Sequence, residues 1–348
     1  MSVDGLYLGY ETAFWIWRKV GPLAGIELMP TRVRSLAGGV PTRAKLEAFH
    51  SNHPDLVLDA VDVLVRPGDQ RRVPGVKAHV ISRSLPDRSF YRLDDDVYVA
   101  SPELTLFQLA SRLTEAQALK LAMEMCGGYA IDMLTAEFYD SDPFASDNES
   151  DGFCKRAPLT SKRKLSAFAD RLLRPGSRAH SVKFLRWLAD GSASPRETAL
   201  CMLLCMPPRL GGYGLALPEL NKRIELTPEE REMVGVHHFD CDLYWSRENA
   251  RVALEYDSKR HHTAEEKQER DAIRRNTLQY IGVRVITATR VQVNRPSQFD
   301  KLARQTARAT GKRVRPAEKE HIAARRDLRE TLFAWDVFAQ VRPWMGLQ

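Results

Sequence analysis

Residues 238–257 read HFDCDLYWSRENARVALEYD and decide the fold of the second half of the chain. Apolar and polar residues alternate in both halves of this run, which is typical of β-strands with one buried face. The alternation places Asp240 and Asp242 on one face of the first strand. It places Glu255 and Asp257 together in the second strand, after the polar turn 246–249. The sequence therefore predicts two successive strands that each project two carboxylates from one side.

Carboxylates near the end of an apolar strand are costly to bury. Removing them from water costs several kcal/mol unless a cation or a bound metal compensates. Oxygen ligands alone favour Mg²⁺ or Mn²⁺ over Zn²⁺. Such a metal lowers the pKa of an attacking water molecule and stabilises charge on a phosphate. We therefore expect Mg²⁺ (or Mn²⁺) as the cofactor.

Further elements surround these two strands. Ser194 and Glu197 form a capping box that opens a helix through about residue 206, and a strand is expected over 223–226. Thr263 and Glu266 open a second helix, which ends at Gly282. A strand over 283–288 follows, and then a helix capped by Ser297 and closed by Gly311. The predicted order is helix, three strands, helix, strand, helix.

The first half of the chain has the pattern of a smaller α/β domain. Strands are expected over 56–65 and 97–100, and Ser101-Pro102 opens a helix. An acidic stretch without bases, 140–151, predicts a linker. We thus predict an N-terminal α/β domain over 1–139, a linker over 140–160, a basic helical connector over 161–193, the main domain over 194–312 and a helical tail over 313–348.

Several motifs of the main domain, in this order, resemble the very short patch repair (Vsr)-like endonuclease domains of the PD-(D/E)XK restriction-endonuclease superfamily. The motifs are Cys241-Asp242-Leu243-Tyr244-Trp245, Ala253-Leu254-Glu255-Tyr256-Asp257 with His261, Arg270-Asp271, and Gly282-Val283-Arg284-Val285-Ile286. The resemblance covers residues 194–312 and implies a restriction-endonuclease-like α/β fold. It also implies a metal-dependent endonuclease that hydrolyses DNA phosphodiester bonds. More weakly, residues 99–106 (VASPELTL) resemble a segment of AbiEi-type abortive-infection antitoxin proteins.

The resemblance assigns roles to three acids. It implies that Asp242 and Glu255 are the acids of the first and second motifs, and that Glu197 is the acid of the preceding helix. These three are the expected metal ligands, although a capping box alone would also explain Glu197. Two positions depart from the superfamily pattern: Asp257 stands where lysine is frequent, and Ser258 where glycine is usual.

Three further residues are candidates for the catalytic chemistry. Asp257 is expected to assist at the metal, and Lys259 is the alternative source of the missing positive charge. His261 is a candidate for proton transfer or for contact with the leaving phosphate. A surface pair with His262 explains it equally well.

Basic residues suggest where DNA would bind. The chain carries a net charge of +7, and two basic stretches occupy 162–186 and 284–315. Surface ion pairs with Glu266 or Asp271 are the alternative for the helical arginines. The expected DNA-binding residues are Arg270, Arg274, Arg275, Arg284, Lys162, Arg163 and Lys164.

Composition excludes other classes. The five cysteines form neither a disulfide framework nor a zinc motif, and Cys201 and Cys205 are expected as buried thiols. Apolar stretches are too short to cross a membrane, so we expect a cytoplasmic protein that is nucleoid-associated when bound to DNA. The expected partners are DNA, no membrane, and either a second copy or a partner protein of a defence system. Repair or defence against phage and mobile elements would be the setting.

A second function class stays open at this stage. The nuclease fold can survive as a scaffold in a non-catalytic DNA-binding regulator or antitoxin-type protein, and the basic stretches suit both functions. The intact acid pair favours the enzyme, because a scaffold has no need of carboxylates that repel DNA. A protein-interaction module is a third alternative.

Overall fold

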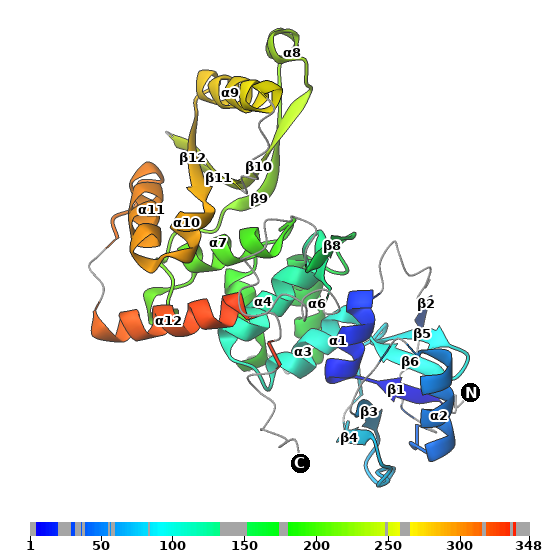
Figure 1. Cartoon of the computed structure of the whole chain (residues 1–348). Coiled ribbons are helices and arrows are strands. Elements are labelled where there is room, and N and C mark those ends of the chain that lie inside the picture. The colour runs from blue at the N-terminus through cyan, green and yellow to red at the C-terminus, as the bar shows by residue number, and fades with distance from the viewer. Residues whose placement is uncertain are drawn as a thin grey trace. The chain divides into compact units, whose positions relative to one another are not determined.

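The structure is a computed structural model of the 348-residue chain. It describes residues 5–19, 29–31, 36, 39–54, 56, 60–82, 84–132, 152–173, 180–247, 250–257, 265–314, 318–334 and 337–338, without the side chains of 29–31, 233 and 265–271. Two compact units divide the chain: unit 1 comprises 1–125 and 156–186, and unit 2 comprises 126–155 and 187–348. Both contain helices and sheets (Figure 1), so the predicted α/β class is confirmed.

A mixed six-stranded sheet forms the centre of unit 1. The strands lie in the order β2 (Met29–Thr31), β5 (Phe90–Asp94), β6 (Val97–Ala100), β1 (Leu6–Leu8), β3 (Val61–Val65) and β4 (Val76–Val80). β1 runs parallel to β6, and β3 runs parallel to β4. The helices are α1 (Tyr10–Lys19), α2 (Arg43–Asn52), α3 (Pro102–Ala110), α4 (Glu115–Met125) and α6 (Lys162–Leu172), and a 3₁₀ segment, η1, spans His180–Trp187.

Local sequence explains how α3 is placed. The Ser101 hydroxyl accepts a hydrogen bond from the Leu104 amide at 3.2 Å, and Pro102 occupies the first helical position, as predicted. Every residue of β3 is buried. Asp62 is therefore an acid inside the core of this unit.

A four-stranded sheet forms the centre of unit 2. Its order is β12 (Val283–Thr289), β11 (Ala250–Asp257), β10 (His238–Arg247) and β9 (Glu219–Glu225). β9, β10 and β11 are antiparallel neighbours, whereas β12 runs parallel to β11. The helix α9 (Glu265–Tyr280) supplies the crossover and packs on β12 (Figure 1). The other elements are β7 (Tyr129–Ile131), β8 (Phe153–Lys155), α7 (Pro195–Cys205), η2 (Pro208–Leu210), α8 (Pro228–Val234), α10 (Arg290–Asn294), α11 (Pro296–Ala309) and α12 (Lys319–Phe333).

The elements predicted for 194–312 are present, with local differences. Ser297 does not cap α11, because that helix begins at Pro296 and follows Arg295 without a side-chain cap. Thr289 instead forms a capping box that opens the short helix α10. The predicted cap Thr263 lies outside the described residues.

The chain also divides differently from the predicted succession of segments. Residues 126–155 belong to unit 2, where β7 pairs with β8 through Ala130 and Cys154. Residues 156–186, which include most of the expected connector, belong to unit 1. The predicted linker 140–160 therefore includes a strand, while its acidic part lies outside the described residues. No helix in the described ranges has the length and apolar character needed to span a membrane.

Candidate active site

The pairing of β10 with its two neighbouring strands is interrupted at Asp242. The pairings with β9 pass from Cys241–Lys222 to Leu243–Leu220, and those with β11 end at Leu243–Leu254. Asp242 Oδ2 instead accepts a hydrogen bond from the Tyr256 amide at 2.7 Å. The carboxylate thus bridges from its own strand to β11, and burial raises the pKa of Asp242.

Glu255, on β11, is the second buried acid of this site. Its side chain is only 14% exposed, and Oε1 has no hydrogen-bond partner among the described residues. The neighbouring Cys241 thiol is too weak a donor to replace such a partner. Burial, followed by the charge of Asp242, raises the pKa of Glu255 to about 7. A buried carboxylate oxygen without a partner is a natural place for a cation.

Glu197 is held in the first turn of α7. Oε2 accepts from the Ala193 amide at 2.8 Å, and Oε1 accepts from the Ser194 hydroxyl at 3.0 Å. The Ser194 hydroxyl in turn accepts from the Glu197 amide, as a helix cap does. Burial and then the charge of Asp242 raise the pKa of Glu197 to about 7. Ser194 is therefore the N-cap of α7, and Glu197 accepts hydrogen bonds from Ala193 and Ser194 without closing the full capping box that the sequence predicts. The role of Glu197 as a metal ligand stays a prediction.

Asn221, which the sequence did not single out, fixes Glu197 from β9. Its side-chain amide donates to Glu197 Oε2 and, at 2.9 Å, to the Gly191 carbonyl. Its φ of +48° lies in the left-handed region, which asparagine tolerates better than most residues. This residue stands at the point of β9 where the pairing with β10 skips Asp242.

Arg274, on α9, supplies a positive charge to the acids. Its Nη2 donates to Glu255 Oε2 at 3.1 Å and also to the Asp240 carbonyl. The guanidinium lies 5.7 Å from the centre of the Phe239 ring. Arg274, expected at DNA phosphates, is turned toward the acid pair in the structure.

Asp240 does not join the acid pair, although strand alternation places it on the face of Asp242. Its exposed carboxylate accepts hydrogen bonds from Arg223 at 3.0 and 3.2 Å. This ion pair with the neighbouring strand lowers the pKa of Asp240. Two acids of one strand thus have opposite environments.

The other predicted site residues are scattered in the structure. Asp257 is half-buried at the end of β11, and Arg275 and Arg284 are exposed in unit 2. Lys162, Arg163 and Lys164 form the first turn of α6 in unit 1. Residues outside the described part are Lys259, His261 and the Arg270 side chain. Cys201 and Cys205 are buried free thiols, as predicted.

The fit of the acids to a metal rests on the pair Asp242 and Glu255. Among the described residues, no three His, Cys, Asp or Glu side chains are grouped closely enough to hold a metal ion. Mg²⁺ commonly uses only one or two protein carboxylates and keeps several water ligands. The unpartnered Oε1 of Glu255 and the raised pKa values of both acids fit such a site. The oxygen-only pair suits Mg²⁺ or Mn²⁺.

Comparisons with known proteins give no relative. No family model, no curated protein and no solved structure matches the chain.

Proposed function

We propose that this protein is a metal-dependent DNA endonuclease of the Vsr-like type. The observation that carries the proposal is the buried acid pair, Asp242 and Glu255, at the point where β10 and β11 separate. A core that only needs to be stable has no use for two like charges in this position. The sequence motifs around the two acids give independent support.

The order of elements also supports the proposal. α7 is followed by the antiparallel strands β9, β10 and β11, then by α9 and by β12 parallel to β11. This order is the one expected for a restriction-endonuclease-like domain, apart from the short α8. The acids of the motifs lie on the two central strands of the sheet.

In the proposed reaction, Asp242 and Glu255 would hold Mg²⁺ or Mn²⁺, and Glu197 and Asp257 would assist. A divalent cation in this place supplies positive charge for the phosphate and lowers the pKa of a coordinated water. Glu197 is kept near Asp242 by its hydrogen bonds to the Ala193 amide, just before α7, and to Asn221. Arg274 brings the positive charge that Asp257 does not provide at the usual lysine position.

The protein would bind DNA through basic side chains on its surface. Arg275 and Arg284 are exposed in the unit that holds the acids. In unit 1, the basic residues Lys162, Arg163 and Lys164 occupy the first turn of α6, where the helix dipole disfavours positive charge. Because these side chains do not favour the stability of the helix, we infer that they serve another purpose, and contacts with DNA phosphates are such a purpose.

The test is cleavage of a supercoiled plasmid by the purified full chain with Mg²⁺, Mn²⁺, Ca²⁺ or EDTA. The proposal predicts nicked or linear product with Mg²⁺ or Mn²⁺ and none with EDTA. A product that persists in EDTA would indicate a contaminating or metal-independent nuclease. If no product forms with any metal on plasmid, single-stranded or mismatched DNA, the proposal fails.

One observation favours the non-catalytic alternative. Arg274 already gives Glu255 a cationic partner within the chain, so the acid pair is partly neutralised without metal. A DNA-binding regulator on the same scaffold would bind DNA with salt dependence but would leave it uncut. Binding without cleavage in the plasmid experiment would select this alternative.

A further inference from the structure

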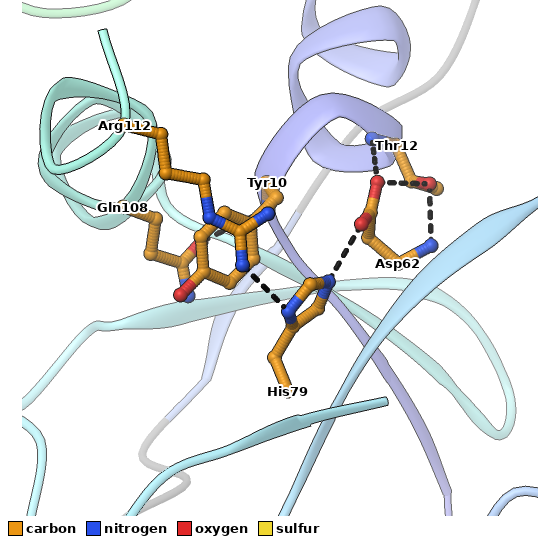
Figure 2. A network of polar contacts seen from close by, with 6 residues as sticks. All are labelled: Tyr10, Thr12, Asp62, His79, Gln108 and Arg112. Atoms are coloured by element: carbon orange, nitrogen blue, oxygen red, sulfur yellow. Dashed lines mark hydrogen bonds and ion pairs between the residues drawn. The ribbon is translucent and has the colours of Figure 1, made fainter. Parts of the chain in front are cut away.

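A second polar cluster lies in unit 1, far in sequence from the acids of unit 2. Asp62 on β3 accepts a hydrogen bond from His79 on β4, with 2.6 Å between Oδ1 and Nε2. The other ring nitrogen, Nδ1, lies 3.0 Å from Nη2 of Arg112, just after α3. Figure 2 shows this chain of contacts beside Tyr10, the first residue of α1.

The partners of His79 fix its tautomer. A guanidinium can only donate, so Nδ1 of His79 accepts from Arg112 and the ring proton sits on Nε2, facing Asp62. Asp62 Oδ2 is 3.4 Å from both the amide and the hydroxyl of Thr12, which hold it in place. The imidazole is thereby oriented by a buried carboxylate, while its other edge faces an exposed arginine.

Arg112 has capacity for a further ligand. Its guanidinium lies 4.1 Å from the centre of the Tyr10 ring and forms no ion pair with a carboxylate among the described residues. The Tyr10 ring also lies 4.1 Å from the His79 ring, centre to centre. The arginine is therefore positioned by two rings, and most of its N–H donors remain available.

Two further features are unexpected in a purely structural network. Tyr10 has a φ of +48°, a left-handed backbone that is strained for an aromatic residue. Gln108 is only 7% exposed, yet its Nε2 has no hydrogen-bond partner among the described residues. Its Oε1 accepts from the Tyr10 amide at 3.0 Å, so Nε2 belongs to the same cluster (Figure 2).

We propose that Arg112 and Gln108, with Arg112 held in place by His79, form a binding site for a phosphate group. Arg112 offers its planar fork and Gln108 offers an unpartnered amide, while Nδ1 of His79 accepts a hydrogen bond from Arg112 and so orients the guanidinium. A guanidinium fork and an amide N–H from separate side chains match the several oxygens of a phosphate group. This site is independent of the nuclease proposal.

The phosphate has two chemical sources that an experiment can separate. A phosphomonoester, as in a nucleotide, carries a dianionic group, whereas a nucleic-acid backbone offers only diesters. Isothermal titration calorimetry of the full chain with inorganic phosphate, with a nucleoside 5′-monophosphate and with an unphosphorylated oligonucleotide compares them at constant ionic strength. A nucleotide or phosphate signal that Arg112→Met weakens assigns a monoester. An oligonucleotide signal assigns a diester to this site only if Arg112→Met weakens it, because the nuclease proposal expects the chain to bind DNA elsewhere as well.

Variants show whether these residues form the site. Gln108→Glu keeps an acceptor for the Tyr10 amide but replaces the amide donor with a negative charge, and Arg112→Met removes the guanidinium. Both should weaken binding at least tenfold and leave the far-ultraviolet circular dichroism spectrum unchanged. Arg71→Met, an exposed arginine of the same unit, is the matched control and should bind like wild type.

Gln108→Glu and Arg112→Met each test the site on their own, so the experiment still decides if one of them folds poorly. Absence of binding to all three probes by the wild type at millimolar concentration would overturn the proposal. So would equal affinities of wild type and a folded Gln108→Glu or Arg112→Met variant. A loss that also occurs in Arg71→Met would reflect general surface charge and would equally overturn it.

Discussion

The Nη2 atom of Arg274 lies 3.1 Å from Oε2 of Glu255, so an arginine of α9 is an ion-pair partner of the buried acid pair. The same guanidinium lowers the pKa of Glu255, which burial and Asp242 otherwise raise. A cation bound between the acids would have to share Glu255 with Arg274. The proposed metal affinity would therefore be coupled to the position of Arg274.

Arg274→Met should bind Mn²⁺ more tightly than wild type. The substitution removes a positive charge that repels the metal and frees Glu255 Oε2, while the methionine retains an apolar stem against Phe239. Calorimetric titration with Mn²⁺ should show an affinity gain of roughly tenfold, for a charge interaction of about 1.4 kcal/mol. Arg275→Met, its exposed neighbour, should match wild type. Weaker Mn²⁺ binding in Arg274→Met would contradict this competition.

Stability should depend on pH through Glu255. Its folded pKa of about 7 lies above the ordinary value of 4.5, so the folded state binds the proton more tightly than the unfolded state. The contribution of Glu255 to the free energy of unfolding should then be largest below pH 4.5 and should fall as the pH rises toward 7. Glutamine does not titrate, so the free energy of unfolding of Glu255→Gln, relative to that of wild type, should rise by about 2–3 kcal/mol from pH 5 to pH 8.

Urea unfolding of wild type and Glu255→Gln at both pH values measures that difference without metal. The exposed Asp240→Asn is a useful control, because the pKa of the Asp240 carboxyl is lowered from its ordinary value of 3.8. That carboxyl is ionised at both pH values, so the effect of Asp240→Asn on stability should be the same at pH 5 and pH 8. A difference between wild type and Glu255→Gln that does not change from pH 5 to pH 8 would refute the assignment.

Asn221 should be sensitive to backbone as well as side-chain chemistry. Both Asn221→Ala and Asn221→Gly lose the hydrogen bonds to Glu197 and Gly191, at roughly 1–3 kcal/mol. Only alanine also has to adopt the left-handed backbone, which costs about 1 kcal/mol more. In thermal unfolding, wild type should therefore be the most stable protein, Asn221→Gly less stable and Asn221→Ala the least stable. Equal stability of all three would show that the strained position does not matter.

The missing lysine gives a prediction about Asp257 and Lys259. If Asp257 assists at the metal, Asp257→Asn should raise the Mg²⁺ concentration needed for half-maximal cleavage, and Lys259→Met should change little. A metal titration of the cleavage rate distinguishes the two residues. A rate loss of roughly 10²–10⁴ in Lys259→Met with a silent Asp257→Asn would assign the role to the lysine instead.

Short-range patterns predicted much of unit 2. Strand alternation located β10 and β11, and the glycines 282 and 311 ended helices in the positive-φ conformation expected of them. The cost of burying charge in an apolar strand drew attention to the acids of β10 and β11, but the resemblance of the motifs singled out Asp242 and Glu255, and their role as metal ligands stays a prediction.

Features set by tertiary packing were not predictable from these patterns. Alternation could not separate exposed Asp240 from buried Asp242, since Arg223 reaches only the former from a strand 17 residues away in sequence. The turn of Arg274 toward Glu255 and the φ of Asn221 likewise depend on neighbours distant in sequence. The pairing of β7 with β8 escaped prediction because the two strands flank a long acidic stretch.

The most direct measurement of the central claim compares two asparagine variants of one strand. Asp242→Asn removes an acid of the buried pair, whereas Asp240→Asn removes the exposed acid two residues earlier. With Mg²⁺ and supercoiled plasmid, Asp242→Asn should cut roughly a thousandfold more slowly than wild type, since the metal stabilises charge by several kcal/mol. Asp240→Asn should cut at the wild-type rate. Equal cleavage rates for Asp242→Asn and wild type would contradict the account.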